Sequence, residues 1–414
     1  MAGRPTLVRV HVAPGAEWEP RSVRAVLTWQ GVNVRVLDQT LTPVGPSLDL
    51  DLDSTFTFEL PPEEVVPGAA WSVELLEVDE GTGPGDDAGA AWPGDDTLQP
   101  TVVERAGTLK VHVLPISYGA DGSDRLPDTS PEQILLLEDL LLRTWPVEAV
   151  ELTVDPTPYP LDYHVWANGV NWGDLLYDIT GERVARSIPD DTYLFALFRP
   201  TATPSAYCSG GCFTGRSWTA DDPDDAFARV SVGLGYPGEG TALTMLHQLG
   251  HTHGRSDAPC SGINPDPDYP YENATLGAPG WDHVDGDLKD PAEYRDLMSW
   301  CAPRWASDYT WLALHERAVR VNTEEAAARL PDPWRVLGLE VDGTLELAGL
   351  IHPADAPDGD EVKVELLAAD SKVLASVLGR FQPDAHMPGG ALLLPEPEDK
   401  QVAGFRALGQ VVWR

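Results

Sequence analysis

The residues best suited to chemistry lie in the segment TMLHQLGHTHGRSDAPC, residues 244–260. His247 and His251 are four positions apart, which on a helix places both imidazoles on one face, one turn apart. Two neutral imidazoles at that separation can hold one zinc ion. Gly254 can end or bend the helix because glycine tolerates positive φ, and the returning chain brings the Asp257 carboxylate toward the same metal. Three protein ligands leave a fourth zinc position open for water, as a catalytic zinc requires.

Two other histidines are poorer candidates for the metal. His253 follows His251 by two residues, about 200° around a helix, so it should face away. His283 lies in the loop-like stretch GWDHVDGD. Histidine pairs four residues apart also occur by chance on many helices. The prediction of a zinc site therefore depends on the glycine and the aspartate at their offsets.

A methionine in the segment YRDLMSWC, Met298, adds a second element. With it, the sequence resembles the metzincin metallopeptidases, whose signature is H-E-x-x-H-x-x-G-x-x-[HD] followed by a Met-containing turn beneath the metal. The matching residues are His247, His251, Gly254, Asp257 and Met298. The resemblance covers roughly residues 107–325 and implies a zinc-dependent endopeptidase. More loosely, the arrangement is similar to secreted bacterial metzincins with appended β-domains, including those that cleave mucin-like glycoproteins.

Two positions depart from this family. Gln248 stands where an active metzincin has the glutamate that takes a proton from zinc-bound water and passes it to the leaving amine. Glutamine can hydrogen-bond the water but cannot accept its proton, so zinc and substrate should still bind while turnover collapses. Trp300 stands where several metzincins have a tyrosine that lends a hydroxyl to the transition state. Tyr294 and Tyr309 are the alternative donors, unless the donor is absent.

Two explanations of Gln248 remain open. A natural pseudopeptidase usually loses other parts of its site, yet here the ligands, the glycine and the methionine all remain. A single Glu→Gln change is also how an enzyme is inactivated on purpose, and the sequence favours this explanation. Three functions compete: a secreted zinc endopeptidase acting on proteins or glycoproteins, a pseudopeptidase that binds a protein or glycan, and a β-rich surface or assembly protein with a structural zinc.

The four cysteines are expected to form two disulfides, Cys208–Cys212 and Cys260–Cys301. A single C-x-x-x-C pair with no matching second pair argues against a zinc site built on cysteine. Cys260 follows Asp257 by three residues and Cys301 follows Met298 by three, so their bond would tie the third-ligand loop to the Met-turn. Disulfides indicate an oxidising, extracellular compartment.

The composition excludes some partners. The formal net charge of −38 repels DNA, RNA and anionic membranes. No apolar run reaches the roughly 18 residues that a membrane span needs. A strand pattern begins within a few residues of Met1, so we expect a secreted protein whose leader has been removed. The oligomeric state is not indicated.

Three regions must position the candidate site, and together they predict an α+β multidomain protein. Residues 1–105 contain short strand patterns bounded by Gly, Pro and Asp, which predict an immunoglobulin-like β-sandwich. Residues 107–330 alternate strand and helix patterns, which predict an α/β domain that would be metzincin-like. Residues 332–414 return to strands and predict a second β-sandwich.

Three local features near the site lead to further predictions. Ser130, Pro131 and Gln133 predict a helix start with a capping box. The strand pattern at 226–235 precedes the zinc helix and is the candidate sheet edge for pairing with an extended substrate. The acidic stretch 221–226 can be a solvated surface, a Ca²⁺ site or a region that attracts basic substrates.

Overall fold

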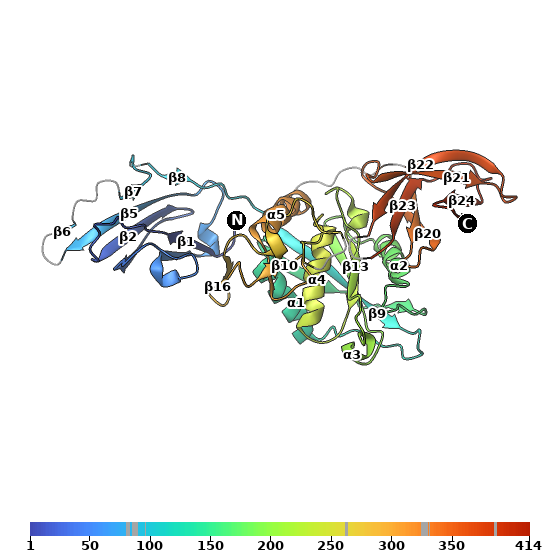
Figure 1. Ribbon diagram of the computed structural model, residues 1–414, viewed down its shortest axis with the longest axis horizontal. Coiled ribbons are helices and arrows are strands. Elements are labelled where there is room, and N and C mark those ends of the chain that lie inside the picture. The colour runs from blue at the N-terminus through green and yellow to red at the C-terminus, as the bar shows by residue number, and fades with distance from the viewer. Residues whose placement is uncertain are drawn as a thin grey trace.

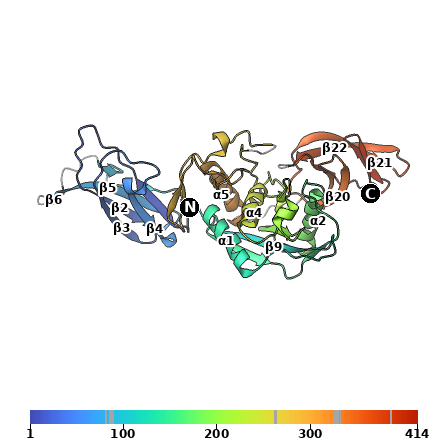
Figure 2. The ribbon, with the colours of Figure 1, turned by 60° about the horizontal axis from the view of Figure 1, so that its bottom comes forward.

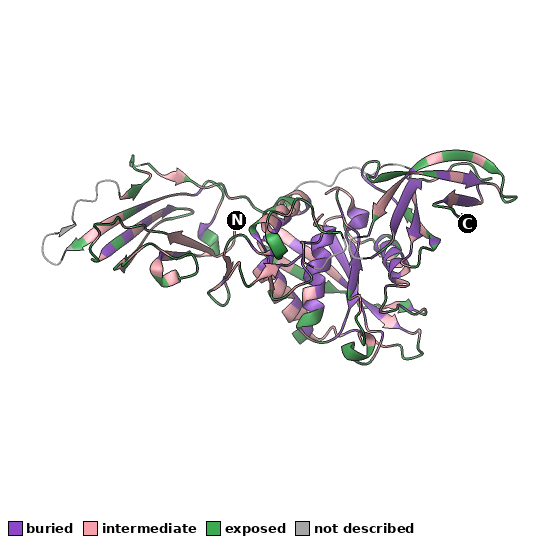
Figure 3. Ribbon diagram, in the orientation of Figure 1, coloured by how far each residue is buried: buried purple, intermediate pink, exposed green. Residues whose placement is uncertain are grey.

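The computed structural model describes residues 1–79, 83–84, 90–95, 97–260, 264–323, 330, 332–384 and 387–414. Strands outnumber helices, and the elements form three consecutive parts along an elongated molecule (Figures 1 and 2). The helices α1, α2, α4 and α5 lie in the central part (Figure 1). Buried residues are also densest in this part (Figure 3). Among the described residues, no helix is both long and apolar enough to cross a membrane.

The N-terminal part is built from two antiparallel sheets. Its elements are β1 (Thr6–Val10), β2 (Val23–Gln30), β3 (Val34–Leu41), η1 (Leu52–Ser54), β4 (Phe56–Leu60), η2 (Pro62–Glu64), β5 (Ala70–Asp79), β6 (Gly83–Pro84), β7 (Ala91–Trp92) and β8 (Gln99–Pro100). Strand β1 pairs with β4, while the larger sheet has the order β3-β2-β5 with β6, β7 and β8 along β5. Alternate residues of β2, such as Ala25 and Leu27, are buried against Phe56 and Phe58 of β4. The two sheets therefore enclose a small sandwich-like core.

The central part is an α/β unit. Its elements are β9 (Thr108–Tyr118), α1 (Pro131–Thr144), β10 (Ala149–Val154), β11 (Tyr159–Leu161), α2 (Trp172–Ala185), β12 (Thr192–Phe198), α3 (Pro204–Tyr207), β13 (Gly215–Ser217), η3 (Ala226–Ala228), β14 (Val230–Leu234), α4 (Glu239–Thr252), η4 (Glu272–Ala274), β15 (Gly280–Asp282), β16 (Asp287–Lys289), β17 (Arg295–Asp296), β18 (Arg304–Trp305) and α5 (Asp308–Thr323). Its sheet has the order β10-β9-β12-β14-β13, with β11 also beside β9. The first four strands are parallel, and β13 runs antiparallel to β14.

Both faces of this sheet are covered by helices. Every residue of β12 is buried, as expected for a strand packed on both sides. Leu194, Ala196 and Phe198 belong to the core cluster that includes α2. Phe195 and Leu197 belong to the opposite cluster, which includes α1, α4 and α5. Helix α4 is thus held on one face of the sheet, and its inward residues are fixed by packing.

The strand expected at the sheet edge is instead internal. Residues 226–235 contain η3 and β14, and β14 lies between β12 and β13. The prediction was wrong because Gly215–Ser217 folds back as an antiparallel strand and covers β14. A strand of three residues is too short to give a periodic signal in the sequence. The edge nearest helix α4 is therefore β13.

The start of α1 is only partly as predicted. Ser130 is the N-cap and its hydroxyl accepts a hydrogen bond from the Gln133 backbone N–H at 3.3 Å, with Pro131 at the first helical position. The Gln133 side chain does not complete a capping box, because it bonds to Gly238 instead. Its Oε1 accepts from the Gly238 N–H at 2.6 Å, and its Nε2 donates to the Gly238 carbonyl at 3.2 Å. Gln133 therefore fixes the N-cap residue of α4.

The C-terminal part is one curled sheet rather than the expected two-sheet sandwich. Its strands are β19 (Trp334–Leu339), β20 (Leu345–Ile351), β21 (Asp360–Leu367), β22 (Val373–Pro383), β23 (Gly390–Pro395), β24 (Gly404–Ala407) and β25 (Gln410–Trp413), in the antiparallel order β20-β19-β23-β22-β21-β24-β25. Register shifts at Val336/Leu337 and Leu366/Leu367 bend the sheet. The end strands approach each other, and Gln410 accepts from the Leu345 N–H at 3.0 Å. The sheet is therefore close to a barrel.

This sheet shares a core with the central part. Trp334, Val336 and Leu393 pack in the same cluster as Leu175 and Leu176 of α2. The shared cluster fixes the curled sheet against the α2 face of the central unit.

Candidate metal centre

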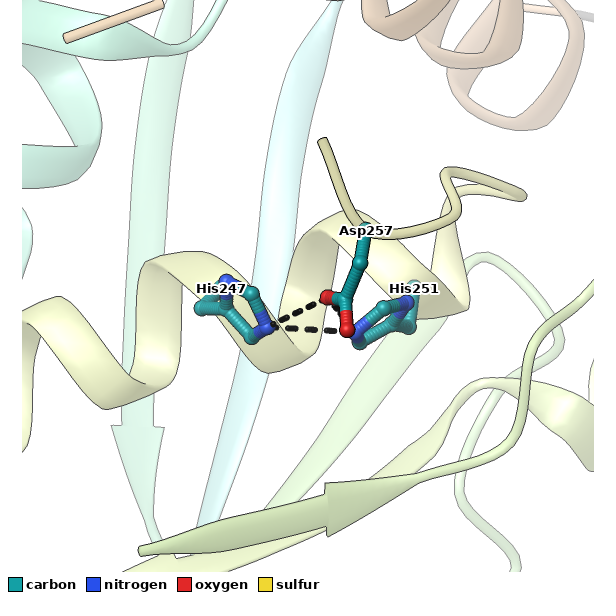
Figure 4. A group of neighbouring side chains, drawn as sticks. All are labelled: His247, His251 and Asp257. Carbon is teal, nitrogen blue, oxygen red and sulfur yellow. Dashed lines mark hydrogen bonds and ion pairs between the residues drawn. The ribbon is translucent and has the colours of Figure 1, made fainter. Parts of the chain in front are cut away.

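Helix α4 and the loop after it bring three potential ligands together. His247 and His251 point from one face of α4 toward the Asp257 carboxylate (Figure 4). The His247 Nε2 lies 3.2 Å from Asp257 Oδ1 and 3.2 Å from His251 Nε2, and His251 Nε2 lies 3.5 Å from Asp257 Oδ1. All three side chains are buried. These three residues form a compact cluster that can bind a metal ion, and we call them the metal group.

Backbone carbonyl groups beside the two imidazoles determine which nitrogen of each ring carries the proton. His247 Nδ1 is 3.1 Å from the Leu297 carbonyl oxygen, and His251 Nδ1 is 2.6 Å from the Arg255 carbonyl oxygen. A carbonyl oxygen can only accept, so each Nδ1 carries the proton and donates it. In the neutral rings each Nε2 then presents a lone pair. The inward-facing nitrogens are therefore ready to act as metal ligands.

The loop that returns Asp257 begins at the end of α4. Gly254 has φ of +81°, its N–H donates to the His251 carbonyl at 2.8 Å, and the Arg255 N–H donates to the Gly250 carbonyl at 3.0 Å. These two bonds make a Schellman motif, which needs a residue with positive φ. The glycine thus ends the helix as the sequence predicts and turns the chain toward Asp257.

Met298 lies directly beneath the helix. It is 1% exposed, and a Cβ added at Gly250 would lie 2.1 Å from its sulfur. The turn around it is held by Asp296, whose carboxylate accepts from the Met298 N–H at 2.7 Å and the Ser307 N–H at 2.9 Å. Burial raises the pKa of Asp296 above its ordinary value. Sequence reasoning missed Asp296, because its two partners are known only once the turn is folded.

Both predicted disulfides are confirmed, as Cys208–Cys212 and Cys260–Cys301. The second joins the loop after Asp257 to the segment after Met298. The Ala258 N–H also donates to the Met298 carbonyl at 2.9 Å. The third-ligand loop and the Met298 turn are therefore tied together by a covalent bond and a backbone hydrogen bond.

A cavity of about 180 Å³ adjoins the metal group. Its lining residues come from the end of the Cys208–Cys212 loop, β13, α4 and the segment after Met298; they are Cys212, Phe213, Thr214, Gly215, Thr244, His247, Gln248, Trp300 and Arg304. Gln248 is buried and lies against β13. Gln248, the residue expected at a general-base position, thus lies in the wall between the metal group and the sheet edge.

The two tyrosines expected as hydroxyl donors do not line this cavity. The Tyr309 hydroxyl donates to Asp266 at 3.1 Å, and the Arg255 guanidinium lies 4.6 Å from its ring centre. The Lys289 ammonium lies 5.8 Å from the ring centre of Tyr294. Trp300 and Arg304 line the cavity instead. Arg304 was missed because no spacing relates it to the histidines.

The two poorer histidine candidates lie outside the metal group. His253 accepts from the Trp145 indole N–H at 3.3 Å and stacks on Tyr193 with ring centres 4.3 Å apart. Burial lowers the pKa of His253 to about 3, so it is a neutral core residue. His283 is 3.4 Å from an Arg4 guanidinium nitrogen. Neither contributes to the group around Asp257.

Among the described residues, the acidic stretch at 221–226 contains no group of three side chains with metal-ligand geometry. Asp224 pairs with Arg320 at 2.5 Å, and Asp225 accepts from the Ala354 N–H at 2.9 Å. Burial raises the pKa of Asp225 to about 6.

The other described group with metal-ligand geometry is Asp282, Asp285 and Asp287. Arg143 lies within 3.0 Å of the first two carboxylates, and Lys289 lies 2.9 Å from the third. These two cations offset part of the charge of the three carboxylates.

Comparisons with known proteins leave the function open. No family model matches this chain, and no curated protein matches it. One solved structure that matches is described as "Structure of a chaperone-substrate complex", with 11% identity and a TM-score of 0.25. The match covers 65% of this chain and 39% of the other chain. Similarity at this level carries no argument about fold or function.

Proposed function

We propose that this chain is a zinc endopeptidase of metzincin type in which Gln248 replaces the general base. The observation that carries the proposal is the convergence of His247 Nε2, His251 Nε2 and Asp257 Oδ1 within 3.2–3.5 Å of one another. Two nitrogen lone pairs and a carboxylate oxygen at these distances repel one another unless a cation lies between them. A proton can serve one pair of these atoms, whereas a metal ion serves all three.

The ligand set and its spacing fit zinc. Tetrahedral zinc with ligands at about 2.0–2.2 Å separates its ligand atoms by about 3.3–3.5 Å. Calcium prefers six to eight oxygen ligands at about 2.3–2.6 Å, which two imidazoles and one carboxylate do not provide. His247, His251 and Asp257 would therefore hold zinc and leave one position open.

When bound, zinc would act as a Lewis acid and lower the pKa of a coordinated water. The Gln248 side chain can hold that water by a hydrogen bond, but its amide has no basic site for the proton. Among the described residues, β13 is the end strand of the central sheet. An extended peptide can pair with its outer edge, next to Gly215, which would place a peptide bond near the metal group. In this proposal Gln248 removes only the proton acceptor, so zinc and substrate can still bind while peptide hydrolysis is lost.

The competing proposal is a natural pseudopeptidase that binds a protein or glycan. The same geometry supports it, because the metal group and the adjoining cavity do not need a glutamate at 248. The two disulfides support an extracellular location for either function. The natural residue at position 248 and the effect of restoring glutamate separate the two proposals.

The deciding experiment is Gln248→Glu. We expect the variant to hydrolyse proteins at least ~10²-fold faster, the lower end of what a positioned general base contributes. Both forms are compared at equal zinc loading on unfolded, folded and glycosylated proteins, and a chelator control is included. The matched control is Gln401→Glu, which makes the same substitution at an exposed residue outside the cavity. If Gln248→Glu binds zinc but cleaves nothing that the parent leaves intact, the binding function replaces the peptidase function.

A further inference from the structure

The cavity beside the metal group contains a positive charge that has no counter-ion among the described residues. Among its described lining residues, Arg304 is the one Arg or Lys side chain. Among the described residues, no carboxylate forms an ion pair with the Arg304 guanidinium, and burial is what shifts its pKa. Its Nη1 reaches the Ser299 carbonyl oxygen only at 3.5 Å, and its Nε is buried without a hydrogen-bond partner. The terminal nitrogens of Arg304 thus have no strong partner among the described residues and can bind a ligand.

The lack of a carboxylate partner among the described residues is unusual for an arginine in such an acidic chain. The sequence has 66 Asp and Glu against 28 Lys and Arg, so carboxylate partners are abundant. Arg216 lies 2.6 Å from Asp384, and Arg255 lies 3.0 Å from Asp266. Burial lowers the pKa of Arg304, which reflects the cost of removing its charge from water. A partly buried cation without a partner is expected to gain from binding an anion.

The backbone that carries Arg304 is held in place. Strand β18 pairs with β17, and the Arg295 N–H donates to the Pro303 carbonyl at 2.8 Å. The Cys260–Cys301 disulfide anchors the chain on one side of Arg304, and the bond from the Ser307 N–H to Asp296 anchors it on the other. The guanidinium is therefore presented from a fixed segment, which reduces the entropy lost on binding.

We infer that this cavity selects peptides with a carboxylate side chain on the residue beside the scissile bond, and that Arg304 binds this carboxylate. A volume of about 180 Å³ suits one amino-acid side chain. A guanidinium can bind a carboxylate through two parallel hydrogen bonds. The net charge of −38 repels acidic peptides at long range, so recognition depends on this local contact. The inference rests on the proposed peptidase function, which places the peptide at the metal.

The test uses two dipeptide amides that carry a hydroxamate group at the N-terminus. They differ only in having Glu or Gln as the residue beside the hydroxamate. The hydroxamate anchors each probe on zinc, and the Gln248 chain binds without cleaving. Dissociation constants are measured by calorimetry at fixed zinc loading and about 0.15 M salt. We expect the Glu probe to bind at least ~10-fold more tightly, as charge-assisted hydrogen bonds allow. A third probe with Gln and a free C-terminal carboxylate shows whether a terminal carboxylate serves equally, which would contradict side-chain selection.

Variants at position 304 assign the effect. Arg304→Gln should reduce the Glu/Gln preference to about twofold or less, and Arg304→Lys should retain part of it because lysine keeps the charge but loses the fork geometry. Arg380→Gln is the matched control, since Arg380 pairs with Glu361 on the C-terminal sheet. Equal binding of the two probes by the parent chain overturns the inference, and so does a preference that survives Arg304→Gln. Failure of both probes to bind the zinc-loaded chain also overturns it.

The outcome is separable from that of the proposed function. Cleavage by the Gln248→Glu form without preference for acidic residues would reject the carboxylate pocket and keep the peptidase. An Arg304-dependent preference in the binding assay, with no cleavage by the Gln248→Glu form, would keep the carboxylate pocket and reject the peptidase.

Discussion

Gly215 of β13 and Gln248 of α4 are in such close contact that no side chain fits between them. A Cβ added at Gly215 would lie 2.7 Å from Gln248 Cγ and 2.9 Å from its Cδ and Nε2. The strand β13 at the sheet edge therefore sets the position of Gln248. Because Gly215 does not have positive φ, this closeness is its only evident requirement for glycine.

This contact predicts that Gly215→Ala impairs any activity restored at position 248. In the Gln248→Glu background, the added methyl group should displace the carboxylate and lower the rate at least ~10-fold, as for other small misplacements of a catalytic group. Zinc content should not change, because neither residue is a ligand. The rates of the single and double variants are compared with those of Gly240→Ala, whose Cβ would meet nothing within 4 Å. Equal losses for the two glycine variants would contradict the prediction.

A second close contact lies between Gly250 of α4 and Met298. Gly250→Ala should destabilise the chain by about 1–3 kcal/mol, because its Cβ would lie 2.1 Å from the buried Met298 sulfur. Glycine to alanine inside a helix is otherwise favourable by up to ~1 kcal/mol. Urea unfolding measures both effects.

Two comparisons test the Gly250 prediction. Gly181→Ala on α2 is the control, since its Cβ would meet nothing within 4 Å, and it should be neutral or stabilising. Gly250→Ala should also cost less when Met298 is already alanine, and a double-mutant cycle measures this coupling. An unchanged cost would show that the contact is not responsible.

The candidate ligand positions could be proposed from sequence because most of them are local. His247, His251 and Gly254 lie within one helix and its C-terminal turn, where a spacing of four residues and one positive φ decide the geometry. The Cys260–Cys301 pairing was motivated by its offsets to Asp257 and Met298, two residues that the resemblance to metzincins had singled out. The alternation of strand and helix likewise predicted four strands of the central sheet, β9, β10, β12 and β14.

Features that depend on distant contacts could not be predicted. Strand β13 has three residues and exists only because β14 is beside it. Gln133 met a helix-start pattern but bonds to Gly238, more than a hundred positions away. Arg304 has no motif at all. In the C-terminal region the patterns predicted strands, but the closure of one sheet depends on bends that composition does not reveal.

The metal group leads to a direct prediction for zinc. The chain should bind one zinc ion, and His251→Ala should lose it, because His251 supplies one of three converging ligand atoms. Metal analysis after dialysis measures occupancy. His11→Ala is the control, since His11 is exposed in the N-terminal part. Full zinc occupancy in His251→Ala would reject the assignment.

A chelator should also lower the unfolding temperature of the parent but not that of His251→Ala, because zinc stabilises only the form that binds it.

The junction between the central part and the C-terminal sheet predicts a pH dependence of stability. Glu340 is 6% exposed and lies 4.0 Å from Arg216, a residue next to Gly215 in β13. Burial raises the pKa of Glu340 from 4.5 to about 7, despite the opposing charge of Arg216 and with added repulsion from Asp174, Glu346 and Asp384. The folded chain therefore holds a proton on Glu340 that the unfolded chain releases at lower pH.

The sign follows from this proton. Between about pH 4.5 and 7 the folded state binds more protons at this site, so the Glu340 contribution to stability falls as pH rises, by at most about 1.4 kcal/mol per pH unit. Asp174 and Asp225, whose pKa values are raised to about 6, add to the same trend. Glu340→Gln should flatten the profile, because a neutral amide has no proton to lose. Urea unfolding at pH 5.5, 6.5 and 8 measures the slope, with Glu361→Gln on the exposed face of the C-terminal sheet as the control. A slope that is identical in the parent and in Glu340→Gln would show that Glu340 is not the titrating group.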